Sequence, residues 1–208
     1  MQQKFLIKAK MIEEIKQRIF EIVEIKLSEQ GFNSQALRSI EMALSLEPYY
    51  CDLIFPQGIP ELIISYNEWH DYKIISNLKI KTFVSIRDKV SAALIEKITT
   101  QNQIFVSNSL KFVKTPTNIA IGAKVAWNTA CAVWHWAGDS SLDYNFYSKR
   151  IIFDILYYKA LNFYSLDKSL NNIETKNYIT NLVNNFVEKI TKIKNFQFNR
   201  LPIFRYFL

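Results

Sequence analysis

The sequence has few of the residues that build disulfide frameworks, metal centres and phosphate-binding loops. Its 208 residues include two cysteines, two histidines and four glycines. Cys51 and Cys131 lie far apart in apolar segments, and they form neither a CxxC pair nor a disulfide-type framework. We therefore expect the protein to work in a reducing compartment.

Segments for export and for crossing a membrane are also missing. No stretch of about 18 apolar residues, the length that a spanning helix needs, is free of charge. The start, MQQKFLIKAKMIEEI, lacks the apolar core and cleavage site of a signal peptide and the Arg- and Ser-rich character of a transit peptide. Membrane contact is therefore expected to be peripheral.

The motifs of common catalytic sites are absent. The sequence contains no Walker loop, no GxGxxG and no GxSxG. Cys131 and His135 are one helical turn apart, but no Gly-rich oxyanion loop or obvious orienting group accompanies them. The other histidine, His70, is not part of a Glu-x-x-His metal motif. We expect no catalytic residues, no metal and no cofactor, so an enzyme is the least supported class.

The composition indicates a folded domain with a preference for acidic partners. A hydrophobic content of 49% is enough for a substantial core in a chain of this length. The net charge of +7 and the pI near 9.3 favour nucleic acid or an anionic membrane surface, without choosing between them.

Apolar residues recur at helical spacing along almost the whole chain, and no β-type alternation is present. The first stripe stops at Gly31, and Asn33 or Ser34 can cap a short second helix. Pro48 is expected in the first turn of a third helix, PYYCDLIF, and Pro60 can open a fourth. The sequence predicts nine helices, with stripes that include Ile19, Val23 and Leu27; Leu37 and Ile40; Leu62, Ile63 and Tyr66; Phe83, Ile86, Val90, Leu94 and Ile98; Ile104 to Val113; Ala126 and Ala130; and Ile179 and Val183.

These helices predict an all-α fold with consecutive parts. The first three, closely joined, suggest a helix-turn-helix head over residues 1–58, which ends at the Pro- and Gly-containing break at 56–60. A larger helical body over 59–194 follows, and an aromatic and basic tail covers 195–208. The two long apolar helices near the end of the body are suited to pairing across a dimer.

The segment WHWAGDSSLDYNFYSKR, residues 134–150, resembles either a reactive centre or a contact surface. Gly138 is expected to end the seventh helix, and Ser140 to Asp143 has the S-x-x-D form of a helix cap. Asp139 is expected near the positive end of the next helix dipole, a stabilising position that needs no chemistry. Both aspartates are therefore interpreted as structural.

The following helix, predicted from about 142 to 164, carries Tyr147, Arg150 and Asp154 at spacings of three and four, with Phe146 adjacent. Aromatic and arginine side chains are strong interface anchors, yet aromatics at helical spacing also enter cores. The residue pattern leaves both alternatives open.

The run from Ala137 to Arg150 resembles the AGD-x-S-x-D-[FY]-N-W-Y-[ST]-[KR]-R signature of the coenzyme Q biosynthesis protein nine family, an accessory family of ubiquinone biosynthesis. The resemblance implies a TetR-regulator-like fold whose helical body binds isoprenoid lipid. It also implies a non-catalytic homodimer that engages the di-iron demethoxyubiquinone hydroxylase and presents a quinone precursor to it. The family's tryptophan is Phe146 in this chain, which keeps an apolar ring but lacks an indole N–H.

Two sets of site residues are expected. Small residues of the seventh helix leave room for a lipid beside apolar walls, although a filled core gives the same pattern. The expected lipid-binding residues are Trp127, Ala130, Trp134 and Ile151. The expected partner-binding residues are Val133, Trp136, Asp143, Phe146, Tyr147 and Arg150.

The main alternative is a TetR-type DNA-binding regulator. The third helix opposes this function because the segment from Pro48 to Phe55 contains Asp52 and no Lys or Arg, whereas groove docking needs several cations. Specific nucleic-acid binding is therefore not expected. The tail mixes aromatic rings with Arg200 and Arg205, which suits an anionic membrane surface or a cover for the core. The expected location is the bacterial cytoplasm at the inner membrane, or the matrix face of the mitochondrial inner membrane in a eukaryote.

Overall fold

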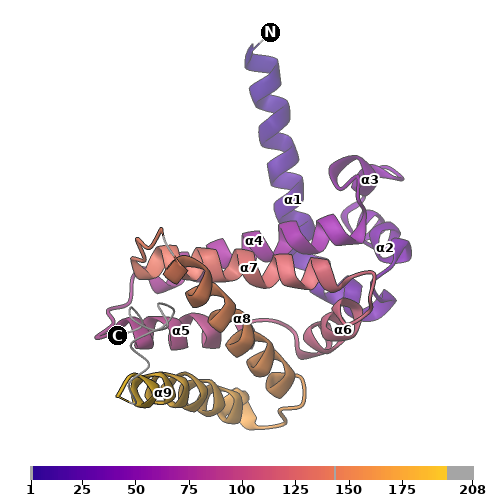
Figure 1. Ribbon diagram of the computed structural model, residues 1–208. Helices are drawn as coiled ribbons and strands as arrows, with labels where there is room; N and C mark the ends of the chain where they lie inside the picture. Colours follow the sequence, from indigo (N-terminus) through magenta and orange to yellow (C-terminus); the bar gives the residue numbers. More distant parts are fainter. Residues whose placement is uncertain (1, 143, 196–208) are drawn as a thin grey trace. The chain divides into compact units, whose positions relative to one another are not determined.

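The computed structural model describes residues 2–142 and 144–195 (Figure 1). Over these residues the chain is helical and has no strand, which confirms the all-α class and is consistent with a TetR-like fold. The helices are α1 Gln2–Gln30, α2 Ser34–Leu44, α3 Tyr50–Ile54, α4 Ile59–Leu78, α5 Ile86–Thr99, α6 Gln103–Val113, α7 Ile119–Ala137, α8 Tyr144–Tyr164 and α9 Ile173–Asn195, with a 3₁₀ turn at Leu170–Asn172.

The helices form two compact units, each made of two separate stretches of chain. The first unit contains residues 1–69 and 101–122, and the second contains residues 70–100 and 123–208. The helices α4 and α7 each begin in the first unit and end in the second. The division into a head over residues 1–58 and a body over 59–194, which the sequence suggested, stays a prediction. Residues 196–208 of the predicted tail lie outside the described residues.

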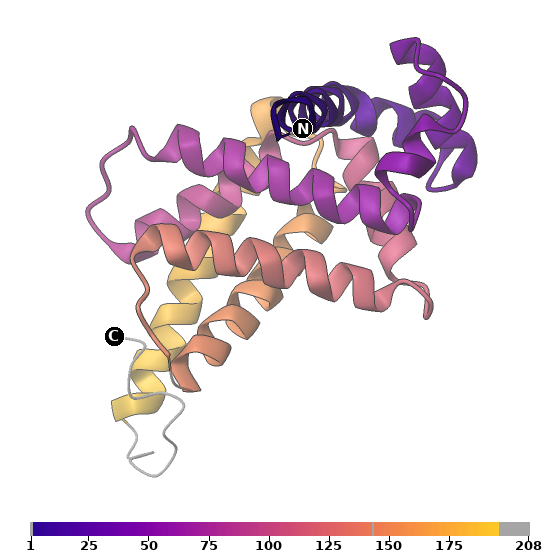
Figure 2. The ribbon, with the colours of Figure 1, turned by 90° about the horizontal axis from the view of Figure 1, so that it is seen from above.

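The first unit is built on the amphipathic helix α1. Ile19, Val23 and Leu27 are fully buried, and α1 ends where Gly31 adopts a positive φ of 79°. Asn33 caps α2 by accepting a hydrogen bond from the backbone N–H of Gln35. Figure 2 shows α2 and α3 following the end of α1, and α1 also packs against α6. The predicted helix ends at Gly31 and Asn33 are therefore confirmed.

The start of α3 differs from the prediction. Pro48 was expected in its first turn, but the helix begins at Tyr50, after Tyr49 in a left-handed conformation with φ of 64°. The buried carboxylate of Glu41 on α2 accepts hydrogen bonds from the backbone N–H groups of Tyr49, at 3.1 Å, and Cys51, at 2.8 Å. This carboxylate, rather than the proline, decides where α3 begins, because it satisfies the N–H groups at the helix start.

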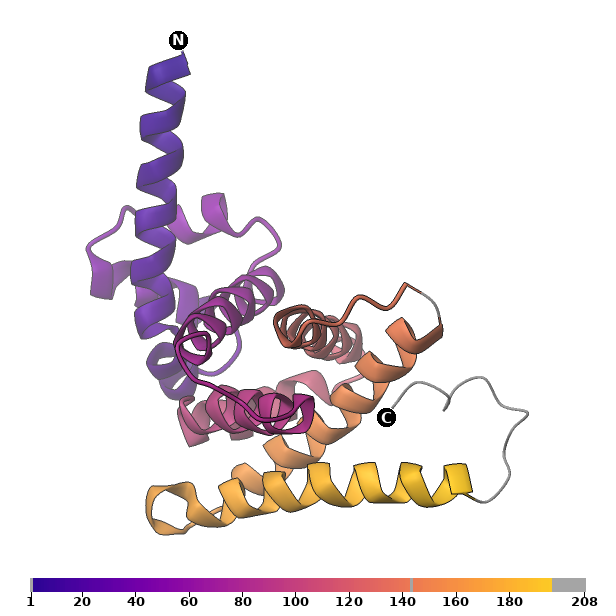
Figure 3. The ribbon, with the colours of Figure 1, turned by 90° about the vertical axis from the view of Figure 1, so that its left-hand side faces the viewer.

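Helices α5, α8 and α9 pack against one another in the second unit (Figure 3). Leu94, Ile98, Phe153 and Ile179 are among their buried side chains. The predicted stripe of α5 is confirmed from Val90 onward only. Ser85 and Asp88 form a capping box that starts the helix at Ile86, so Phe83 precedes it, and the Ile86 side chain is exposed.

A buried ion pair lies inside the second unit. Lys97 Nζ of α5 is 2.7 Å from Asp71 Oδ1 of α4, and the two side chains are 1% and 6% exposed. The second oxygen of Asp71 accepts a hydrogen bond from the Thr129 hydroxyl of α7 at 2.9 Å. The interaction thus joins three helices through one carboxylate.

None of the described helices is long and apolar enough to cross a membrane.

Replacing Lys97 by methionine is expected to lower the free energy of unfolding by about 3 kcal/mol, because Asp71 would keep a buried charge without its partner. The double variant Asp71→Leu/Lys97→Met, which removes both charges, should recover most of this loss. Urea unfolding of the two variants and the wild type measures the difference. A double variant less stable than Lys97→Met would contradict this account of the pair.

Candidate functional site

The junction between α7 and α8 in the second unit contains most of the signature residues. Gly138, with a φ of 94°, ends α7 as predicted. The backbone N–H of Asp139 donates a hydrogen bond to the Trp134 carbonyl at 2.9 Å, and this bond closes the last turn of α7. The helix α8 begins at Tyr144, two residues later than predicted, and Asp143 with its proposed cap lies outside the described residues.

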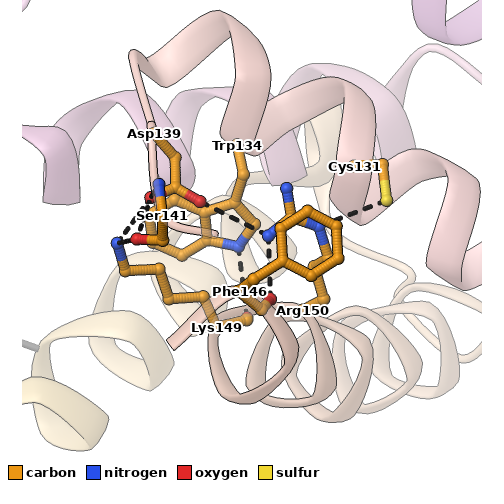
Figure 4. A network of polar contacts seen from close by, with 7 residues as sticks. All are labelled: Cys131, Trp134, Asp139, Ser141, Phe146, Lys149 and Arg150. Carbon is orange, nitrogen blue, oxygen red and sulfur yellow. Dashed lines mark hydrogen bonds and ion pairs between the residues drawn. The ribbon is translucent and has the colours of Figure 1, made fainter. Parts of the chain in front are cut away.

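The carboxylate of Asp139 is the centre of the junction (Figure 4). It accepts hydrogen bonds from Lys149 Nζ at 2.6 Å, Ser141 Oγ at 2.7 Å and Arg150 Nη1 at 3.3 Å. Its side chain is 3% exposed. Burial opposes its ionisation, but the hydrogen bonds from Lys149 and Ser141 outweigh burial, so the pKa of Asp139 falls below its ordinary value of 3.8.

Arg150 fixes the first turns of α8 to this carboxylate. Its side chain is buried, Nη1 also donates to the Phe146 carbonyl at 2.8 Å, and Nε donates to Cys131 Sγ at 3.2 Å. The guanidinium carbon lies 3.4 Å from the centre of the Phe146 ring. These contacts make Arg150 an internal cross-link between α7, the loop and α8. The role of Arg150 in partner binding that the sequence suggested stays a prediction.

The polar contacts around Trp134 complete the junction. Its indole N–H donates to the Lys149 carbonyl at 3.1 Å, and Lys149 Nζ lies 5.5 Å from its ring centre. The Cys131 thiol is engaged by Arg150, and His135 is exposed. The hydrogen bond between Arg150 and Cys131 Sγ therefore helps to fix the start of α8 against α7. This contact gives no support to the thiolate–imidazole pair of Cys131 and His135 that the sequence spacing allowed.

An exposed apolar ridge runs along α8 beside this junction. Tyr147, Ile151 and Ile155 are 57%, 53% and 48% exposed. They are spaced four residues apart, so they share one face of the helix, and we call them the α8 ridge. Trp127 of α7 lies near its start, with ring centres 6.2 Å from those of both Phe146 and Tyr147. The ridge places one predicted partner residue, Tyr147, and one predicted lipid residue, Ile151, on a single surface.

The other predicted site residues have different positions. Ala130, Val133 and Trp134 are buried in the second unit. Trp136 is half-buried, with its ring 5.4 Å from that of Phe83 and 5.6 Å from Lys89 Nζ. Their roles in lipid or partner binding stay predictions. Ile155 was missed, because the sequence of α8 is apolar on nearly every side and gives no separate stripe for the exposed face.

Titratable groups elsewhere show no metal-binding arrangement within the described residues, since no three His, Cys, Asp or Glu side chains gather in one place. Both cysteines are free thiols. Burial raises the pKa of Cys51 to about 12, which keeps this thiol protonated. Burial, with the nearby charge of Lys97, lowers the pKa of His70 to about 2, so its ring is neutral.

The charges around α3 are satisfied inside the first unit. Arg38 of α2 forms ion pairs with Glu41, at 3.0 Å, and with Asp52 of α3. Its guanidinium also lies 4.5 Å from the Tyr49 ring centre. A helix that reads DNA offers cations to phosphates, whereas this arginine faces two carboxylates.

Replacing Asp139 by alanine is expected to reduce the free energy of unfolding at pH 7 by about 3 kcal/mol, because Lys149 and Arg150 would lose the carboxylate that pairs them. The folded-state pKa of Asp139 is lowered, so its contribution is present above the unfolded-state value near 4 and is lost as the pH falls through the folded-state value. Urea unfolding should therefore show a smaller difference in stability between the wild type and Asp139→Ala at pH 3 than at pH 7.

The exposed acid Glu174 of α9 supplies the control, and Glu174→Ala should change stability by less than about 0.5 kcal/mol. Equal stability of Asp139→Ala and the wild type at pH 7 would show that the junction does not depend on Asp139.

Comparison with known proteins adds one finding. Residues 119–189 match the model of the COQ9 family. The matched segment contains all of α7 and α8 and most of α9, and it therefore includes the junction and the α8 ridge. No curated protein matches the chain.

The match confirms the resemblance that the run from Ala137 to Arg150 indicated. COQ9 proteins are accessory proteins of ubiquinone biosynthesis. Residues 119–189 of this chain are therefore similar to the COQ9 family.

Proposed function

We propose that this chain is a non-catalytic accessory protein that binds an isoprenoid quinone precursor and presents it to the di-iron demethoxyubiquinone hydroxylase. The family match and the α8 ridge support this function. A polyprenylated quinone is almost insoluble in water, so an enzyme acting on its ring benefits from a protein that lifts the head group out of the bilayer. The second unit is where both the lipid and the hydroxylase bind.

One observation carries the proposal: among the described signature residues, the side chains of Asp139 and Arg150 are buried and the ring of Tyr147 is exposed. Asp139 and Arg150 bind each other inside the second unit, whereas the side chain of Tyr147 is 57% exposed at the start of the α8 ridge. Large apolar side chains that share an exposed face are typical of contact surfaces, and tyrosine is enriched among the residues that contribute most to binding. We assign hydroxylase contact to Tyr147 and contact with the isoprenoid chain to Ile151.

The protein is proposed to act as a homodimer at a membrane surface, in the bacterial cytoplasm or the mitochondrial matrix. Its net charge of +7 favours anionic headgroups. A TetR-type regulator has less support, because α3 carries no cation and its neighbour Arg38 pairs with Glu41 and Asp52. A charge that is not organised on a recognition helix suits a membrane better than a specific DNA sequence.

Replacing Tyr147 by alanine is expected to weaken hydroxylase binding by about 2 kcal/mol or more, roughly thirty-fold in Kd, because the ring supplies exposed apolar area next to Trp127. The matched control is Tyr72→Ala, since Tyr72 of α4 is 72% exposed. Calorimetric titration gives the affinities, and thermal unfolding shows that both variants are folded. Equal affinity of the two variants would reject Tyr147 as a partner contact.

Tyr147 tests the surface better than Phe146. The Phe146 ring lies under the Arg150 guanidinium, so a lysine there would put two cations together inside the junction.

Purified protein is expected to carry isoprenoid lipid. Native mass spectrometry followed by lipid extraction should release a quinone precursor from the wild type. Ile151→Glu should reduce the amount bound, because a carboxylate would be placed against the hydrocarbon chain. The control is Ile86→Glu, since Ile86 of α5 is 56% exposed. A wild type that yields phospholipid but no isoprenoid would refute the proposed lipid class.

A further inference from the structure

Asp154 is an acidic residue that borders the α8 ridge without a complete set of hydrogen bonds. It lies three residues after Ile151 and four before Tyr158, so it is a neighbour of both on the helix surface. Its Oδ1 atom is buried and has no hydrogen-bond partner among the described residues. A buried carboxylate oxygen without a donor is costly, which makes this atom a candidate for contact with a ligand.

The cation nearest in the helix sequence is directed elsewhere. Arg150 precedes Asp154 by four residues, a spacing at which opposite charges often pair. Its guanidinium instead contacts Asp139, the Phe146 carbonyl and Cys131. On α5, the buried Lys97 is paired with Asp71 of α4. These contacts of the two cations are made with groups other than Asp154.

Two phenols of its own helix, those of Tyr157 and Tyr158, interact electrostatically with Asp154. Burial and then Asp154 raise the pKa of Tyr158 to about 12. The pKa of the buried Tyr157 is raised by burial and by Asp71 of α4, with smaller effects of Tyr158 and Asp154. Both phenols are neutral at physiological pH, so they provide no positive charge for the carboxylate.

We propose that Asp154, as a neutral carboxylic acid, donates a hydrogen bond to a carbonyl oxygen of a quinone ring whose isoprenoid chain lies along the α8 ridge. The inference rests on the proposed function and names the polar determinant of that lipid site. A neutral acid in an apolar setting donates one hydrogen bond, whereas a carboxylate only accepts and repels a carbonyl oxygen. Burial raises the pKa of Asp154 to about 7, so both forms are present near neutral pH.

Binding should therefore weaken as the pH rises. When only the acid form binds, the affinity falls about ten-fold for each pH unit above 7. The probe is a ubiquinone with two isoprene units, and quenching of tryptophan fluorescence between pH 5.5 and 8.5 gives its Kd. Asp154→Asn keeps a donor that does not titrate, so it should bind at every pH about as well as the wild type does at pH 5.5. Asp154→Leu should bind roughly two- to ten-fold more weakly than Asp154→Asn at every pH, because it has no donor.

Two further probes distinguish the source of the carbonyl. An isoprenoid hydrocarbon without oxygen should bind the wild type with no pH dependence, and a short-chain phosphatidylcholine offers ester carbonyls instead of a quinone. A pH effect with phosphatidylcholine but not with the ubiquinone would overturn the assignment to a quinone ring. Glu174→Gln, which changes an exposed acid of α9, should retain the wild-type pH profile.

Stability without ligand gives an independent check that Asp154 titrates and that the variants fold. Because the folded-state pKa is raised, the wild type should lose stability as the pH rises from about 4 to 7, whereas Asp154→Asn should lack this part of the decline. Ubiquinone binding that is independent of pH, or a pH effect that survives in Asp154→Asn, overturns the role of Asp154 alone. Failure of the wild type to bind the ubiquinone at any pH overturns the proposed lipid function together with this inference.

Discussion

The start of α8 depends on one buried carboxylate. The carboxylate of Asp139 accepts hydrogen bonds from Lys149, Arg150 and Ser141 at once, and without it the two cations would lose their counter-charge. A cluster of this kind stabilises a structure only when all of its members are satisfied. Here the cluster also sets a direction. Since Lys149 and Arg150 are held on the inner side of the first turns of α8, Tyr147 is left on the outer side. The helix therefore presents an aromatic ring because its charged neighbours are occupied.

The α8 ridge follows from this orientation and has an energetic cost. Fully burying one large apolar side chain is worth about 1.5–3 kcal/mol, and Tyr147, Ile151 and Ile155 each leave about half of their surface in water. A helix whose only task was to stabilise the second unit would gain from polar residues at these positions. The ridge lies in the segment that matches the COQ9 family, and it adjoins Trp127, so the exposed apolar surface and the family signature coincide. An exposed apolar surface of this kind is what the proposed contacts with a hydrophobic ligand and a protein partner require.

Local signals in the sequence predict the helix ends well and the contacts across the junction poorly. Gly31, Asn33 and Gly138 act on their own backbone, so their positions as caps follow from residue type alone. The start of α3 depends on Glu41, a residue of the preceding helix, and no rule about Pro48 includes it. Helical spacing also groups Arg150 with Tyr147 on α8, but it contains no information about an acceptor on the preceding loop. The two discontinuous units escape prediction for the same reason, because they are defined by contacts between distant stretches of chain.

Arg150 lies between the two acidic residues of the site, Asp139 and Asp154, in the sequence. It follows Asp139 through a loop and precedes Asp154 by four residues, a spacing at which opposite charges on a helix often pair. The contacts favour Asp139, which also receives Lys149 and Ser141 and is ionised with a lowered pKa. The Oδ1 atom of Asp154 is buried and has no hydrogen-bond partner in the part of the chain that the structure describes, and burial raises the pKa of this residue to about 7. The pairing of Arg150 with Asp139 fixes the start of α8. It also leaves the carboxyl group of Asp154, which can bind a proton, beside the α8 ridge. An apolar surface with an acid at its edge that is partly protonated near pH 7 is compatible with the proposed ligand, which is mostly hydrocarbon and carries its oxygen atoms at one end.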